Sequence, residues 1–199
     1  WFGDLVTMEW WDDLWLNESF AEWMGDRIVM EVYPDFDTDV SGLSDTEAAY
    51  IEDSRLTART IRQPVTTVAN LLSTVDALVY QKGQSVLEMM ESWLGPENFR
   101  RGVLAYLQEH QWGNATESDL WAALSKASGR DVGPMGTTYF NQPGIPIVRG
   151  EFENDGRIRL RQQRFLNFGL QDSVARLWQI PISMKYPTAK GVTRHQVLL

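Results

Sequence analysis

Apolar residues in the first two thirds of the chain return at three- and four-residue steps, within long stretches free of turn clusters. This spacing is typical of amphipathic helices, which bury one face and leave the other in water. It predicts helices over residues 13–32, 45–62, 65–72, 76–93, 96–110, 117–128 and 134–140. The chain up to residue 141 is therefore expected to be helical.

Local signals mark where several of these helices begin. A short polar side chain ahead of an apolar run accepts hydrogen bonds from the free backbone N–H groups of a first helical turn. Asp12 or Asp13 is expected to cap the helix 13–32 in this way, and Asp76, ahead of an apolar run, is expected to start the helix 76–93. Thr116 followed by Asp119 resembles a capping box, which predicts a helix start at residue 117.

The period changes to two after the turn signal Asn141-Gln142-Pro143-Gly144. Ile145, Ile147 and Phe152 lie between polar neighbours, and Asn154-Asp155-Gly156 predicts a hairpin turn into a strand over 157–161. Two more strands are expected over 177–185 and 192–198. The fold class is therefore mainly α with a C-terminal antiparallel β part, and the domains are expected to be 1–141 and 142–199. One solvated face of the first hairpin is expected to carry Arg157, Arg159, Arg161 and Arg164.

Composition narrows the classes of partner. The formal net charge is −9 and the isoelectric point is about 4.7, which argues against a nucleic-acid partner, because phosphate binding needs a basic surface. A neutral or cationic substrate suits this charge better. No apolar run approaches the roughly 20 residues of a membrane span, so no span is expected. The chain has no cysteine, which leaves the compartment open.

Both ends have the character of an excised piece. Trp1-Phe2-Gly3-Asp4 has neither an initiator methionine nor a basic signal region, and Gln196-Val197-Leu198-Leu199 reads as a strand without a closing turn. We therefore expect this sequence to be part of a longer protein.

Glu18 is the first candidate for chemistry. On a helix it shares a face with Leu14, Ala21 and Gly25, an apolar surface on which a carboxylate is costly to bury without a cationic partner. A metal ion would be such a partner, and so would a lysine or an arginine. Alternatively, the side chain could reach solvent past its small neighbours, and periodicity leaves these interpretations open.

The segments Trp1–Thr7 and Trp10–Ala21 closely resemble the sequence that follows the HExxH zinc helix in the aminopeptidase N family of gluzincin metallopeptidases. With one Gln supplied before Trp1, Glu18 falls at the family's spacing from the second histidine of HExxH. The resemblance implies that Glu18 is the third zinc ligand. Ser19 stands where the family usually has glycine.

A second resemblance lies further along the chain, where Val79–Leu87 is similar to the family's Tyr-x-Lys-Gly element. It implies that Tyr80 donates a hydrogen bond to the oxyanion of the tetrahedral intermediate, at the place where negative charge develops. Without Lys82 and Gly83 beside it, Tyr80 would be interpreted as an amphipathic side chain on an ordinary helix.

The family resemblance implies a fold and a reaction for the parent protein. The fold is the helical second half of a thermolysin-like catalytic domain followed by a partial antiparallel β-sandwich. The reaction is removal of N-terminal residues from peptides with a free N-terminus, by a water that one zinc ion activates. The chain contains neither HExxH nor the family's amine-binding Gly-x-Met-Glu-Asn segment, and His110 and His195 lie in different predicted regions. We therefore expect the isolated chain to bind no zinc and to be inactive.

Three alternatives stay open at this point. The parent could be a non-catalytic binding module related to the same family. It could also share the chemistry of a related zinc enzyme that opens an epoxide. A carbohydrate-active enzyme is the third, because the nine tryptophans could stack on sugars beside paired carboxylates. The carboxylates available for that role are Glu9, Asp12, Asp13 and Glu22.

Overall fold

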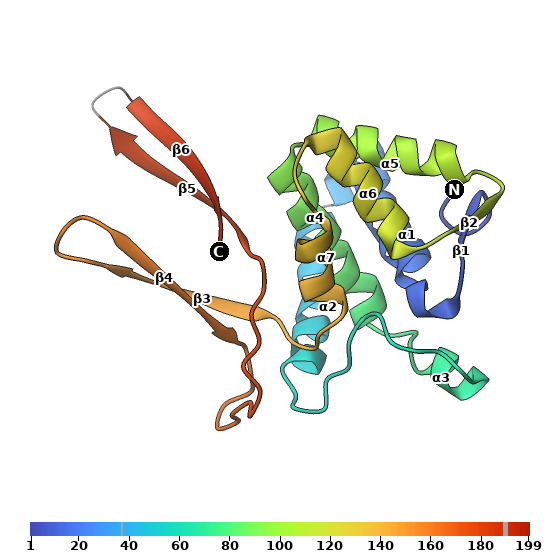
Figure 1. Cartoon of the computed structure of the whole chain (residues 1–199), viewed down its shortest axis with the longest axis horizontal. Coiled ribbons are helices and arrows are strands. Elements are labelled where there is room, and N and C mark those ends of the chain that lie inside the picture. Colours follow the sequence, from blue (N-terminus) through green and yellow to red (C-terminus); the bar gives the residue numbers. More distant parts are fainter. Residues whose placement is uncertain (37, 189–190) are drawn as a thin grey trace.

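The computed structural model of the chain describes residues 1–36, 38–188 and 191–199. A helical body comes first and two β-hairpins extend from it, as Figure 1 shows. This confirms the predicted fold class, mainly α with a C-terminal β part. None of the helices in the described ranges is long and apolar enough to cross a membrane. The α-helices are α1 (Trp15–Val32), α2 (Thr38–Asp53), α3 (Val68–Leu72), α4 (Gly83–Leu94), α5 (Pro96–His110), α6 (Glu117–Ser128) and α7 (Gly133–Phe140).

The C-terminal part consists of two antiparallel hairpins, each a separate two-stranded sheet. The first pairs β3 (Pro146–Phe152) with β4 (Ile158–Arg164), and the second pairs β5 (Pro181–Thr188) with β6 (Gly191–Leu198). Gly156 takes a φ of 84° in the first turn, a conformation that glycine adopts without strain. The predicted domain boundary near residue 142 stays a prediction.

Aromatic stacking forms the centre of the helical body. The ring of Trp15 on α1 is fully buried and stacks on Phe140 of α7 at 3.8 Å and on Trp121 of α6 at 5.3 Å between centroids. Gly136 lets α7 approach closely, because a Cβ there would lie 2.6 Å from the Trp121 ring. The predicted capping box at Thr116 is confirmed, and it begins α6 at the predicted residue.

The predicted helix over 45–62 is wrong at both ends. The described part of α2 already begins at Thr38, and the helix ends at Asp53, after which the chain runs as turns and extended segments. The Asp53 side chain is fully buried and lies 2.7 Å from the ammonium group of Lys82. Because a buried ion pair between distant segments fixes where the chain must go, tertiary contacts override helix propensity here.

The predicted cap of the first helix is also wrong. A 3₁₀ turn, η1 (Trp11–Asp13), precedes α1, and the residue at the cap position is Leu14. Asp13 is buried and its Oδ1 accepts from Nε of Arg62 at 2.6 Å, while Asp12 accepts from the Val65 backbone N–H at 2.7 Å. Both carboxylates therefore bind the segment that follows α2 instead of the start of α1.

Two further differences lie at short elements. A parallel pair, β1 (Val6–Met8) with β2 (Gly113–Ala115), joins the start of the chain to the end of α5. Three residues are too few to show a period-two pattern, so this pair was not predicted. The predicted helix 76–93 begins as a π-helical turn, η3 (Leu78–Lys82), before it continues as α4.

The prediction that Arg164 lies on a solvated face is wrong. Its side chain is buried, and its guanidinium donates to the Arg55 carbonyl at 2.9 Å and to Oδ2 of Asp172 at 2.8 Å. Arg157, Arg159 and Arg161 on the same hairpin are exposed, as predicted. The end of β4 packs against the loop that follows α2. The last arginine of the strand is therefore buried there and connects the hairpin to the helical body.

Candidate functional site

Glu18 lies in the first turn of α1 and is half-buried. Its backbone N–H bonds to the Leu14 carbonyl at 3.2 Å, so the helix fixes the direction of its side chain. The neighbours Leu14, Leu16, Ser19 and Phe20 are buried. The carboxylate therefore lies at the edge of the core, where a cationic or hydrogen-bonding partner is needed.

Tyr80 supplies such a partner. Burial, the hydrogen bond to Glu18 and the charges of Glu18 and Glu22 together raise the pKa of its phenol to about 12. The hydroxyl therefore stays protonated at neutral pH and donates to the Glu18 carboxylate. The structure thus brings together the two residues that the resemblance singled out, from helices far apart in the sequence.

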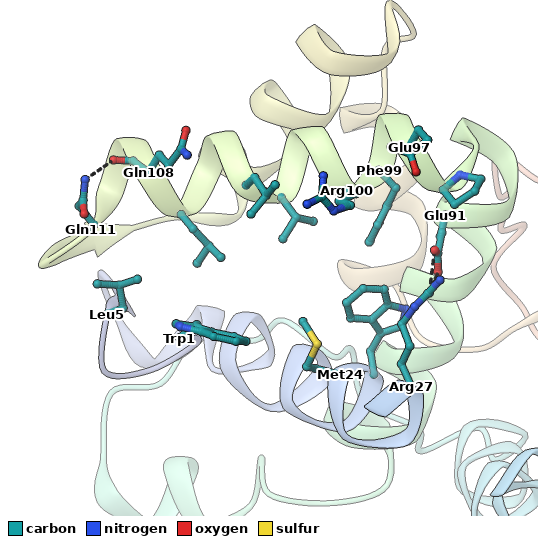
Figure 2. Close-up of a pocket in the computed structure, with 15 residues that line it drawn as sticks. Trp1, Leu5, Met24, Arg27, Glu91, Glu97, Phe99, Arg100, Gln108 and Gln111 are labelled. Carbon is teal, nitrogen blue, oxygen red and sulfur yellow. Dashed lines mark hydrogen bonds and ion pairs between the residues drawn. The ribbon is translucent and has the colours of Figure 1, made fainter. Parts of the chain in front are cut away.

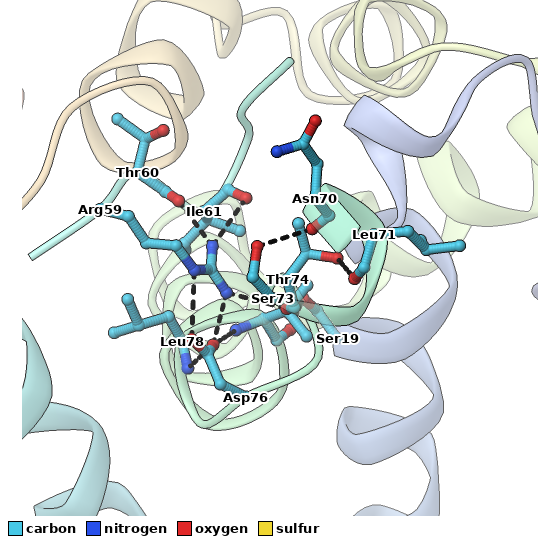
Figure 3. Close-up of polar contacts among 11 residues, drawn as sticks. Ser19, Arg59, Thr60, Ile61, Asn70, Leu71, Ser73, Thr74, Asp76 and Leu78 are labelled. Carbon is cyan, nitrogen blue, oxygen red and sulfur yellow. Dashed lines mark hydrogen bonds and ion pairs between the residues drawn. The ribbon is translucent and has the colours of Figure 1, made fainter. Parts of the chain in front are cut away.

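The turn that carries Tyr80 is held at its start by a polar network, shown in Figure 3. Oδ1 of Asp76 accepts from the backbone N–H of Leu78 at 2.9 Å. Arg59 donates hydrogen bonds to both carboxylate oxygens of Asp76, from Nε to Oδ2 at 3.1 Å and from Nη2 to Oδ1 at 2.5 Å. The same guanidinium donates to the carbonyls of Thr60, Ile61 and Thr74. The helix start at Asp76 was predicted, whereas no periodic signal indicates Arg59.

Ser19 holds the same turn from the side of α1. Its buried hydroxyl donates to the Val79 carbonyl at 2.6 Å, beside the Glu18–Tyr80 pair. The two helices approach so closely that a Cβ on Gly83 would lie 1.9 Å from the Ser19 hydroxyl oxygen. Gly83 is therefore required by packing against Ser19, which stands where the family usually has glycine.

Gly83→Ala is expected to destabilise the chain by about 1–3 kcal/mol, because the added methyl group overlaps the Ser19 side chain. Ser19→Gly removes that overlap, since the next Ser19 atom, its Cα, lies 3.8 Å from the added carbon. The double variant should therefore be about as stable as Ser19→Gly alone. Urea unfolding of the 199-residue chain, followed by tryptophan fluorescence, measures all three variants. Equal losses from Gly83→Ala in both backgrounds would contradict the packing account.

A polar cavity of about 410 Å³ lies beside the pair. Its wall includes Glu22, one turn after Glu18, and Gln81, next to Tyr80, and these two side chains are joined by a hydrogen bond of 3.1 Å. Gln84 and Asp26 continue the wall and bond to each other at 2.8 Å. The cavity is therefore lined by sequence neighbours of the pair, although Glu18 and Tyr80 themselves do not line it, and residues of α2 complete its wall.

A second cavity, of about 490 Å³, is an apolar groove between α1 and α5, shown in Figure 2. Trp23, Met24 and Val103 are among its lining residues, and the ion pair of Arg27 with Glu91 closes one end. Neither Glu18 nor Tyr80 lines it. The groove is therefore separate from the candidate site.

The carboxylates of the carbohydrate hypothesis do not form a catalytic pair. Asp13 pairs with Arg62 and accepts the Glu117 backbone N–H at 3.2 Å, and Asp12 binds the Val65 backbone. Glu22 bonds to Gln81, and Glu9 is exposed. Each of the three buried or half-buried carboxylates thus has a structural partner of its own.

The described part of the chain does not provide a complete donor set for a metal. Among the described residues, no group of three or more histidine or acidic side chains is placed to hold a metal ion. His110 ends α5 with its ring 5.5 Å from that of Tyr106, and His195 lies on β6 opposite Met184. Glu18 can serve as one oxygen ligand, since its carboxylate is half-buried and bonds to a neutral phenol that a cation could replace.

Comparison with known proteins identifies relatives of this chain. A family model described as the peptidase family M1 domain matches residues 1–139. Aminopeptidase 2 of Candida albicans is 41% identical over 199 residues, leucyl aminopeptidase of Saccharolobus solfataricus is 39% identical over 186, and aminopeptidase N of Lactobacillus helveticus is 38% identical over 199.

These matches cover 100%, 93% and 99% of the chain, but the chain spans only 22%, 23% and 24% of the three relatives. The family model covers more than half of the chain, and the similarity includes the segments around Glu18 and Tyr80. The resemblance to the aminopeptidase N family is thereby confirmed: the chain belongs to peptidase family M1.

Proposed function

We propose that this chain is part of a zinc-dependent aminopeptidase that removes N-terminal residues from peptides. The observation that carries the proposal is the hydrogen bond between Tyr80 and Glu18, two side chains that come from different helices far apart in the sequence. Membership of peptidase family M1 and the aminopeptidase names of the relatives support it.

Glu18 is proposed as one zinc ligand, with the remaining ligands supplied by residues outside this chain. A zinc ion bound there would supply a Lewis acid and a water of lowered pKa for attack on a peptide carbonyl. The helical position of Glu18 and its packing against buried neighbours hold the carboxylate in one direction. Such fixed ligands suit a metal site, because little reorganisation is needed on binding.

Tyr80 is proposed as the donor to the oxygen on which negative charge develops. Its pKa of about 12 keeps the phenol protonated, and the turn that carries it is held by Asp76 and Ser19. A donor fixed before the reaction stabilises the developing charge without a reorganisation cost. In the absence of substrate the hydroxyl bonds to Glu18, so it already lies beside the proposed metal ligand.

Substrates are proposed to be peptides with a free, protonated N-terminus. The cavity beside Tyr80 is lined by Glu22, Asp26, Asp45 and Glu88, which favours neutral or cationic chain segments over acidic ones. The full-length protein should hydrolyse a peptide with a free N-terminus and leave the N-acetylated peptide of the same sequence intact. Chromatography of both digests measures this. Equal cleavage of both peptides would exclude an aminopeptidase.

The isolated 199-residue chain is expected to be inactive and to hold no zinc after dialysis, because Glu18 is one ligand and a single carboxylate binds the ion weakly. Metal analysis of the dialysed chain and an assay on an amino-acid anilide measure both properties. About one zinc per chain, or turnover of the anilide, would contradict the expectation.

A further inference from the structure

Lys82 is a buried charged residue to which the proposed reaction gives no role. Its side chain is 3% exposed, and burial lowers the pKa of its ammonium group. It lies two residues after Tyr80, at the end of the π-helical turn η3. A charge is retained at such depth only where partners compensate for the lost hydration.

Within the described residues, Lys82 contacts two polar partners from two other parts of the chain. Its Nζ lies 2.7 Å from Oδ2 of Asp53, at the end of α2, and donates to the Gly144 carbonyl at 3.1 Å. Oδ1 of Asp53 accepts from the Gly144 backbone N–H at 2.7 Å. The ion pair therefore binds both the carbonyl and the N–H of Gly144, just before the first hairpin. Through Lys82 it connects the end of η3 to this point of the chain.

The backbone of Lys82 also defines the π turn. Its N–H donates to the Ala77 carbonyl, five residues earlier, at 3.1 Å. A π turn contains one residue more than an α turn, and such turns are rare and common at functional sites. Relaxation to an α-helix would shift the register by one residue, which turns a side chain by about 100° around the axis.

The start of η3 is fixed independently of Lys82. Arg59 and Asp76 hold the N–H of Leu78, and Ser19 holds the carbonyl of Val79. Because the start of η3 is fixed, the position of Lys82 at its other end determines whether the segment keeps the extra residue of a π turn or relaxes to an α turn. Tyr80 lies between the two fixed ends.

We propose that the buried Lys82–Asp53 ion pair positions Tyr80: it stabilises the π-helical conformation of η3, so that the Tyr80 hydroxyl faces Glu18. The inference rests on the proposed function of Tyr80 and deepens it. Lys82 touches neither substrate nor metal in this role and acts through Tyr80. Because Lys82 and Asp53 both bind the Gly144 backbone, the orientation of Tyr80 also depends on how the helical body joins the first hairpin.

The test uses the full-length protein and the double variant Lys82→Met with Asp53→Asn. Removal of both charges avoids the unpaired buried charge that either single change would leave, and Asn can still accept from the Gly144 N–H. The matched control is Arg27→Met with Glu91→Gln, which removes an ion pair of 2.5 Å between two other helices, α1 and α4. Both variants are made with Tyr80 intact and with Tyr80→Phe.

With Tyr80 intact, the Lys82–Asp53 variant should lower kcat on an amino-acid anilide roughly 10- to 100-fold at nearly unchanged KM, as expected for a misplaced catalytic group. In the Tyr80→Phe background the same change should alter kcat less than about 2-fold, because a positioning residue acts only through the group that it positions. The control pair should leave kcat unchanged in both backgrounds. Thermal melting confirms that the compared variants are folded.

An equal loss of kcat in both backgrounds would overturn the proposal, as would an unchanged kcat with Tyr80 intact. If the variant does not fold, Lys82→Gln with Asp53→Asn, which also removes both charges but keeps a polar group at each position, is measured in the same cycle. Failure of both to fold would also overturn it, because the pair would then be needed for the fold itself. Tyr80→Phe with wild-type kcat would instead refute the proposed role of Tyr80, so the two failures are distinguishable.

Discussion

Tyr80→Phe in the full-length protein is expected to lower kcat for peptide hydrolysis about 10²- to 10³-fold, with KM nearly unchanged. The change removes one hydroxyl that donates to Glu18 in this structure and, in the proposed reaction, to the oxygen that becomes negative. Because the donor acts in the transition state and not in substrate binding, the loss should appear in kcat. Steady-state kinetics on an amino-acid anilide measures it.

Tyr186→Phe is the matched control for this experiment. Tyr186 lies on β5 and is 45% exposed, so the loss of its hydroxyl should leave kcat and KM unchanged. The melting temperature of Tyr80→Phe should stay close to that of the wild type, since Tyr80 is only partly buried. A kcat for Tyr80→Phe within about 3-fold of the wild type would show that the hydroxyl does not stabilise the transition state.

Glu18→Gln in the full-length protein is expected to weaken zinc binding by more than the roughly 10- to 100-fold that loss of an outer partner costs. Glutamine keeps the shape of the side chain and still accepts from the Tyr80 hydroxyl, but its neutral amide is a poor ligand for a divalent cation. Peptide hydrolysis should fall with zinc occupancy and recover in part with added zinc. Titration against a competing chelator measures the affinity.

Glu31→Gln, on the same helix α1 and exposed, is the matched control and should leave zinc affinity unchanged. Equal zinc affinities for Glu18→Gln and the wild type would remove Glu18 from the ligand set. Loss of activity at full zinc occupancy would leave Glu18 a role in the site other than metal binding.

Helices with strong local signals were predicted to the residue. Pro96 predicted the start of the helix over 96–110, and the capping box of Thr116 and Asp119 predicted the start of the helix over 117–128. In the structure α5 and α6 have these bounds. In both, the signal lies within the helix and its cap, so no distant contact has to be known.

Features fixed by distant partners could not be predicted in this way. The end of α2 depends on the ion pair of Asp53 with Lys82, and the burial of Arg164 depends on the loop at Arg55. The π turn around Tyr80 adds one residue to a helical pattern, which a three- and four-residue period does not reveal. These features needed the tertiary structure.

The candidate site followed from motifs and not from periodicity. Pattern alone left Glu18 open between a metal ligand, a partner of a lysine or an arginine, and a solvent-facing side chain, and the structure adds a hydrogen bond from the hydroxyl of Tyr80. The spacing of the two residues along the chain does not imply contact. Their meeting depends on the close approach of α1 and α4 at Ser19 and Gly83, which only the structure reveals.

Anomalous diffraction at the zinc edge, from crystals of the full-length protein, tests the central claim most directly. The account predicts a zinc peak about 2.0–2.2 Å from a carboxylate oxygen of Glu18, with the Tyr80 hydroxyl turned toward the same cavity. A zinc peak that Glu18 does not touch would contradict it, and so would a zinc-loaded crystal in which Tyr80 points away from Glu18 and the metal.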